Sequence, residues 1–164
     1  MSEQMQDASE RFRKKFETYK ELAPQVGEQA AWETLLNGYP ERQKRQMGPY
    51  IDDASLAAGL RRAIPAFRKL GMEMEVVDIS TPSVDAALEV QRICPVLNIS
   101  TEYGFARPCR IICEMDVEAT RRAFGDMSGE ILCTKADGAC VCVFKYERRA
   151  QESPSKANAE RVTE

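Results

Sequence analysis

The residues of this sequence with the greatest chemical potential are its six cysteines. Three of them lie in the stretch CTKADGACVC, which runs from Cys133 to Cys142 around an Asp-Gly pair. Two others, Cys109 and Cys113, are four positions apart and are followed by the carboxylates of Glu114 and Asp116. A thiolate is a nucleophile and a metal ligand, whereas a neutral thiol packs as a small hydrophobic group. The cysteines therefore support three interpretations: a catalytic site, a metal site or ordinary packing.

The chain contains no histidine. Its absence excludes nucleophiles activated by an imidazole, zinc sites with imidazole ligands, and the usual general base near neutral pH. Any proton transfer must fall to carboxylates, cysteines, lysines, tyrosines or water. A cysteine beside a carboxylate is therefore the best catalytic equipment that this sequence offers.

Composition indicates one domain in a reducing compartment. With 164 residues, of which 43% are hydrophobic, the chain can bury one core without disulfides or metals. The net charge of -3 and the scattered basic residues argue against binding to nucleic acid. No apolar run reaches the ~20 residues of a membrane helix, and no secretory signal is recognisable at the N-terminus. We expect a cytoplasmic protein with reduced thiols, no membrane contact and a small-molecule partner, and homo-oligomerisation is left open.

The first half of the sequence predicts helices. Apolar residues recur every three or four positions in several stretches, which is typical of amphipathic helices. Asp52 or Asp53 is the expected N-cap of the third helix, and Pro65 inside that helix predicts a kink or an early end. The expected helices span residues 11–26, 30–36 and 53–70.

The second half predicts a mixed fold. The segment 85–94 fits both a helical and a strand period, and we interpret it as a strand. Strands are also expected at 72–79 and in the runs EILCTK and CVCVFKY, and helices at 96–103 and 116–124. The fold class is therefore α/β (α+β), with N-terminal helices packed on an antiparallel sheet that ends in a C-terminal β-hairpin. We expect one domain over residues 1–148 and a polar, disordered tail over 149–164.

The Asp137-Gly138 pair predicts a two-residue hairpin turn. With that turn, Cys133 lies directly opposite Cys142, with Cβ atoms about 5 Å apart on one face of the sheet. Such a pair could bind a divalent metal such as zinc together with Cys94, although a closed zinc site needs a fourth ligand and the spacing matches no common zinc motif. The alternative interpretation is that these thiols fill the interface between sheet and helices.

The segment from Cys109 to Asp116 predicts a catalytic site. Cys109 and Cys113 share a face on either a helix or a strand, and the neighbouring Arg110 favours a thiolate. We expect Cys113 to act as the nucleophile or as a ligand, and Glu114 and Asp116 to transfer protons. The alternative is a buried cysteine pair followed by Asp116 as the N-cap of a helix.

The order of several short motifs resembles a known enzyme family. Cys94-Pro95 is followed by Cys113 with Asp116 three positions on, and then by the pattern Gly138-x-x-x-Cys142-x-Phe144. Over residues 55–147 this order resembles the L-2-amino-thiazoline-4-carboxylate hydrolases, a family similar to the vinyl-reductase-type small-molecule-binding domains of bacterial regulators. The resemblance implies helices on one side of an antiparallel sheet and an enzyme that cleaves a small substrate. This chain departs from the family by lacking histidine and by having three further cysteines, Cys109, Cys133 and Cys140.

Two functions from different classes follow. The first is a cytoplasmic hydrolase that acts on a C–N or C–S bond of a small nitrogen-containing molecule. Its catalytic residues would be Cys113, Glu114 and Asp116, with Arg110 and Cys94 binding the substrate. The alternative is a non-enzymatic small-molecule-binding or sensor module, in which Cys94, Cys133 and Cys142 hold a structural metal.

Overall fold

The computed structural model describes residues 3–150, which form six α-helices and four β-strands. The helices are α1 (Glu3–Val26), α2 (Glu28–Leu36), α3 (Tyr39–Ile51), α4 (Leu56–Lys69), α5 (Pro95–Tyr103) and α6 (Met115–Ala123). The strands are β1 (Glu73–Asp78), β2 (Val84–Ile93), β3 (Ser128–Cys133) and β4 (Cys142–Arg149). A π turn (Arg110–Glu114) runs directly into α6, and a short 3-10 helix (Lys135–Asp137) lies between β3 and β4.

The four strands form one antiparallel sheet in the order β1-β2-β4-β3. This arrangement confirms the predicted fold class, and it confirms that the ambiguous segment 85–94 is a strand. Alternate residues of β4 are buried, because successive side chains of a strand point to opposite faces, and β2 follows the same pattern except that Ala86 is buried as well. The buried pairs that face each other across these strands are Asp85 with Arg148, Ala87 with Tyr146, Glu89 with Phe144 and Gln91 with Cys142.

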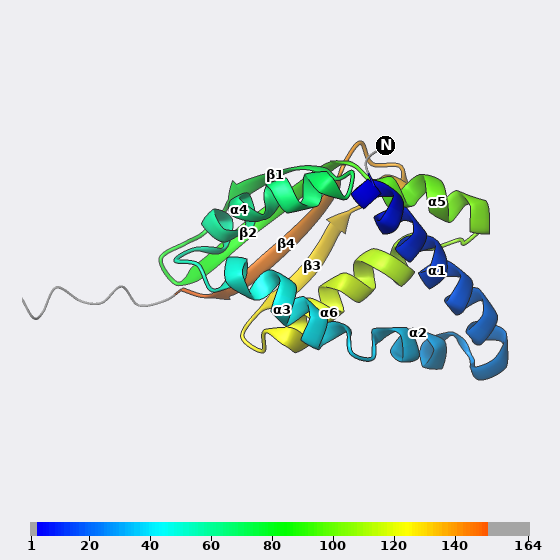
Figure 1. Ribbon diagram of the computed structural model, residues 1–164. Coiled ribbons are helices and arrows are strands. Elements are labelled where there is room, and N and C mark those ends of the chain that lie inside the picture. Colours follow the sequence, from blue (N-terminus) through cyan, green and yellow to red (C-terminus); the bar gives the residue numbers. More distant parts are fainter. Residues whose placement is uncertain (1–2, 151–164) are drawn as a thin grey trace, which may run out of the picture.

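The helices cover one face of the sheet and extend beyond one end of it (Figure 1). Helices α4 and α6 contact the strands, α3 packs against both of them, and α1 packs with α2, α5 and the π turn. The buried side chains form two clusters, one around Phe16 and Trp32 and the other around Leu60 and Phe144. Cys113 packs against both clusters, so the π turn is the place where they meet.

Helix α4 differs from its prediction at both ends. Its N-cap is Ser55, whose hydroxyl accepts a hydrogen bond from the backbone N–H of Ala58 at 3.1 Å, and not Asp52 or Asp53. The helix also continues through Pro65 to its end at Lys69, so the predicted early end is wrong. Pro65 is exposed, and water can therefore satisfy the carbonyl group that loses its helical partner.

Strands β3 and β4 are adjacent, but the predicted two-residue turn between them is wrong. The hydroxyl of Thr134 accepts a hydrogen bond from the backbone N–H of Asp137 at 3.1 Å, which favours the short 3-10 helix over a tight turn. An irregularity in β3 also shifts the register by one residue, so that Cys133 pairs with Val143. Since adjacent residues of a strand face opposite sides, Cys133 does not share a face with Cys142.

The C-terminal end of the described chain belongs to the sheet. Arg149, where the predicted tail begins, is the last residue of β4 and pairs with Val84. Residues 151–164, which make up most of that tail, lie outside the described residues. Within residues 3–150, no helix combines the length and the apolar character needed to cross a membrane.

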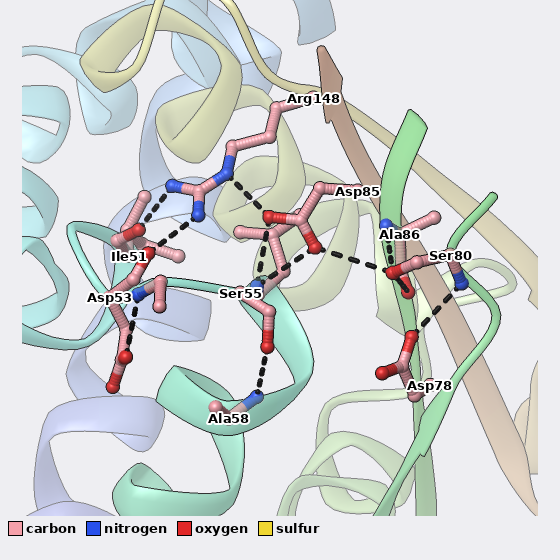
Figure 2. Close-up of polar contacts among 11 residues, drawn as sticks. Ile51, Asp53, Ser55, Ala58, Asp78, Ser80, Asp85, Ala86 and Arg148 are labelled. Atoms are coloured by element: carbon pink, nitrogen blue, oxygen red, sulfur yellow. Dashed lines mark hydrogen bonds and ion pairs between the residues drawn. The ribbon is translucent and has the colours of Figure 1, made fainter. Parts of the chain in front are cut away.

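Arg148 and Asp85 form a buried ion pair at one end of the covered face of the sheet. Nε of Arg148 lies 2.8 Å from Oδ2 of Asp85, and each residue is only 6% exposed. The guanidinium also donates to the backbone carbonyls of Ile51 and Asp53, and Asp85 accepts the backbone N–H of Leu56 at 3.0 Å. Figure 2 shows how these bonds tie β2 and β4 to the connection between α3 and α4.

Replacing Arg148 by methionine should lower the free energy of unfolding by about 3–5 kcal/mol, because Asp85 would remain buried without its partner. Urea unfolding followed by circular dichroism measures the loss. The matched control is Arg149→Met, which removes an exposed charge from the next position and should change stability by less than about 0.5 kcal/mol. Equal losses in the two variants would contradict a structural role for the buried pair.

Candidate functional site

Four cysteines surround a small cavity between α5, the π turn and the start of β4. Cys94 directly precedes α5, Cys109 and Cys113 lie at the π turn, and Cys142 is the first residue of β4. The cavity has a volume of about 10 Å³, which is room for about one water molecule. The rest of its lining comes from Val96, Leu97, Ser100, Pro108, Lys135 and Ala136.

A larger hollow lies next to this thiol cavity. Its volume of about 380 Å³ is within the range of small-molecule sites. Pro108, Cys109 and Ala136 line both spaces, so the hollow and the thiol cavity are neighbours that share a wall. The remaining lining of the hollow comes from Ala106, Arg107, Glu114, Ile131, Thr134 and Asp137.

Cys109 and Cys113 line the same cavity, and each thiol shifts the pKa of the other. The hydrogen bond from Cys113 stabilises the thiolate of Cys109 and lowers the pKa of Cys109 to about 7, with a smaller contribution from Thr134. The pKa of Cys113 is raised well above its usual value, because its thiol donates that bond and is also buried. Cys109 is therefore the better nucleophile of the two, and the Cys113 thiol stabilises the Cys109 thiolate.

Arg110 does not supply this activation. Its guanidinium donates to Oε1 of Gln29 at 2.8 Å and lies 5.5 Å from the ring of Trp32. The ring in turn donates through Nε1 to the backbone carbonyl of Arg110 at 2.9 Å. Arg110 thus fastens the π turn to α2, and the thiol of Cys109 depends on Cys113 instead.

A second group of ionisable residues lies deeper, between α1, α3 and α6. The hydroxyl of Tyr39 donates to Oδ1 of Asp116 at 2.6 Å. The ammonium group of Lys15 and the guanidinium of Arg42 lie 4.3 and 4.2 Å from the centroid of the Tyr39 ring. Burial raises the pKa of Asp116, and it lowers the pKa of Lys15 to about 8. Asp116 is therefore held inside the helix layer and is not the predicted N-cap.

Glu89 faces this group from the sheet. It is 8% exposed, and it makes no hydrogen bond or ion pair with any residue that the structure describes. Burial, together with the nearby negative charge of Asp116, raises the pKa of Glu89 to about 8. Burial and the same two carboxylates also raise the pKa of Tyr146 well above its usual value. Glu89 is thus a largely neutral acid in the interior at neutral pH.

Glu89 should make the stability of the protein fall as pH rises from about 5 to 8. Over that range the side chain ionises in the unfolded chain but stays protonated in the folded one, which favours unfolding. Glu89→Gln should remove this loss and gain about 1–3 kcal/mol over the wild type near pH 8. Chemical unfolding at a series of pH values measures both curves. The control is Glu130→Gln, at an exposed site on β3, which should keep the wild-type dependence of stability on pH. If Glu89→Gln also kept that dependence, the carboxyl group of Glu89 would not be protonated in the folded wild type.

The structure brings together some of the predicted site residues and separates others. Cys94, Cys113 and Cys142 line the thiol cavity, and Glu114 lines the hollow. Asp116 lies deeper, bonded to Tyr39. Cys133 and Arg110 line neither space. Among residues 3–150, no three cysteine or carboxylate side chains converge in a geometry suited to a metal ion.

Several residues of the site were not predicted from the sequence. The acid on the covered face of the sheet, Glu89, lies in a segment whose period fitted both helix and strand, so its face was not defined. With the strand known, the buried run Asp85, Ala87, Glu89 and Gln91 marks an unusually polar inner face. Lys15 and Tyr39 carried no signal, because their proximity to Asp116 depends on how α1, α3 and α6 pack.

Comparison with known proteins identifies the fold. No family model and no curated protein matches the sequence, so the resemblance to the hydrolase family stays a prediction. Among solved structures, the chain is similar to the phenol-responsive sensory domain of the transcription activator PoxR, solved with phenol. The TM-score is 0.58 and the sequence identity 12%, over 84% of this chain and 74% of that chain. The chain therefore shares the fold of a small-molecule sensory domain.

Proposed function

We propose that this chain is a small-molecule-binding domain whose ligand occupies the hollow beside Cys109. The observation that carries this proposal is the hollow itself, with a volume of about 380 Å³ and a lining that combines apolar and polar groups. The similarity to a sensory domain that binds phenol supports it, because the two chains share a fold. This favours the sensor interpretation of the sequence over the hydrolase interpretation.

The lining indicates what kind of molecule would fit. Ile131 and Pro108 offer apolar contacts, suited to a small ring or alkyl group. Arg107 donates to Oε1 of Glu114 at 2.8 Å, and Asp137 lies in the same lining, so charges of both signs reach the hollow. A compact molecule with an apolar body and both donor and acceptor groups, neutral or zwitterionic, matches this lining better than a strongly charged one.

Binding can be tested by two-dimensional NMR of the full chain with phenol and with a set of small nitrogen heterocycles. We expect at least one probe to shift the resonances of Cys109, Ile131 and Ala136 together. Ala136→Trp should fill the hollow and weaken that binding at least about tenfold, because the ligand and the indole would compete for one space. Ala136 is exposed, so the variant should fold.

The matched control is Ala139→Trp, in the same loop but outside the lining of the hollow. It should bind the probe as the wild type does. Shifts confined to another region, or equal binding by Ala136→Trp, would show that the ligand lies elsewhere. If no probe shifts these three residues, the hollow does not bind this class of molecule.

Hydrolysis of a small C–N or C–S substrate is a second candidate, favoured by one observation. Cys109 has a pKa of about 7 and lines the hollow together with the carboxylate of Glu114, which provides a thiolate and a proton-transfer group at one site. The nucleophile would then be Cys109 rather than the predicted Cys113.

The test for this candidate is turnover of a 2-amino-thiazoline carboxylate, the substrate class of the family that the motifs resemble. Cys109→Ser should lower the rate about 10²- to 10⁴-fold, whereas Cys140→Ser, at an exposed thiol outside the site, should not. Turnover that survives Cys109→Ser would overturn the assignment, and an inactive wild type would leave binding as the function.

A further inference from the structure

We propose that Cys109 and Cys113 form an oxidation-sensitive dithiol, which a hydroperoxide converts into an intramolecular disulfide. The proposal rests on the geometry of the π turn and does not depend on the function proposed above. It assigns a modification site to the wall between the hollow and the thiol cavity.

Cys109 and Cys113 lie four residues apart at the π turn and line the same cavity. Four residues of helix rise about 6 Å, which lies within the 4.4–6.8 Å between Cα atoms that a disulfide spans. In a π turn the hydrogen-bonded ring closes over five residues, so residues four apart fall within one turn and on nearly the same side. Cys109 and Cys113 both line the thiol cavity, which has room for about one water molecule, so their side chains reach the same small space. Cβ atoms four residues apart on a regular helix are about 5–6 Å apart, and a disulfide needs about 3.5–4.5 Å, so the bond requires a local shift of the π turn as well as side-chain rotation.

The two thiols differ in access, as an attacking and a resolving cysteine must. Cys109 lines the hollow as well as the thiol cavity, so an oxidant that enters the hollow reaches it first. Cys113 lines only the inner cavity and packs against both hydrophobic clusters. Cys109 is also the thiol with the larger thiolate fraction at neutral pH.

The reaction has two steps. The Cys109 thiolate attacks one oxygen of hydrogen peroxide, the O–O bond breaks, and the departing hydroxide takes a proton to become water, leaving a sulfenic acid. The sulfur of Cys113 then attacks the sulfur of Cys109, the S–O bond breaks, and the hydroxyl group leaves with the Cys113 proton as a second water. In total, two thiols are oxidised to a disulfide and one peroxide is reduced to two molecules of water.

The other cysteines provide a built-in comparison. Burial raises the pKa of Cys94 and of Cys142, so their thiolate fractions are small although both line the cavity. Cys140 is exposed but lines neither the cavity nor the hollow. Access alone would therefore direct oxidation to Cys140, whereas the dithiol geometry directs it to Cys109.

The test is oxidation of the full wild-type chain with a small excess of hydrogen peroxide, followed by mass spectrometry of the intact and digested protein. We expect the loss of two hydrogen atoms per chain and its reversal by dithiothreitol. Trypsin cleaves after Arg110 and so places Cys109 and Cys113 on different peptides, which makes the crosslink visible. Because Arg107 precedes a proline and resists cleavage, Cys94 stays with Cys109, and fragmentation must establish which of them is bonded.

Three variants sharpen the test. Cys113→Ser keeps a hydroxyl donor beside Cys109 but cannot form a disulfide, so it should stop at a Cys109 sulfenic acid that dimedone traps, and Cys109→Ser should lose the fast reaction. Cys140→Ser should behave as the wild type. At pH 7, alkylation of Cys109 in the wild type should be at least about tenfold faster than that of Cys140. Thermal melts show whether Cys113→Ser is folded, and the mapping of the wild type does not depend on that variant.

Three results would overturn the proposal. They are oxidation mainly at Cys140, a disulfide that joins Cys94 or Cys142 in place of Cys113, or a sulfenic acid at Cys109 that persists in the wild type. The first would mean that exposure controls reactivity, the second that the inner cavity holds the reactive pair, and the third that the π turn keeps the two sulfur atoms apart.

Discussion

The buried ion pair of Arg148 and Asp85 fixes how the helices lie on the sheet. Both charges are removed from water, which is costly unless their remaining donors and acceptors are also bonded. Backbone groups of Ile51, Asp53 and Leu56 supply those bonds, and these residues extend from the end of α3 to the start of α4. These bonds hold the C-terminal end of α3 against the sheet, and Tyr39, at the other end of the same helix, bonds to Asp116.

Polarity is distributed along the covered face of the sheet. Its inward residues pass from the ion pair at one end, through Ala87 and Tyr146, to the unpaired Glu89, and then to Gln91 and Cys142 at the thiol cavity. At the end with the ion pair, both charges also bond to backbone groups. The other end has an acid with no hydrogen bond to any residue within 3–150, and four thiols around a space of about 10 Å³. An ionisable acid and four thiols on the inner side of a sheet depart from an apolar core, and such departures are expected at functional sites.

Local patterns predicted the elements well, and they predicted the contacts between elements less well. The order of most helices and of the strands follows from apolar periods and turn residues, but α3 (Tyr39–Ile51) was not among the expected helices. The register of β3 on β4 could not be derived, because the Thr134 hydroxyl competes with the turn that Asp137-Gly138 would otherwise form. The activation of Cys109 was expected from its neighbour in sequence, Arg110, but it comes from its neighbour in space, Cys113. Contacts of that kind depend on the path of the backbone.

The π turn sets the angular phase of the helix that follows it. It adds one residue to a helical segment that is otherwise continuous from Arg110 to Ala123. In an α-helix each residue turns the chain by about 100°, so the added residue determines which way α6 faces relative to Cys109. With it, one short segment directs a thiol toward the hollow and the carboxyl group of Asp116 toward Tyr39 in the interior. If this turn became regular α-helix, either the Cys109 thiol or the Asp116 carboxyl group would rotate out of place. The wall of the hollow and the acid beside Tyr39 are therefore coupled through the one residue that the π turn adds.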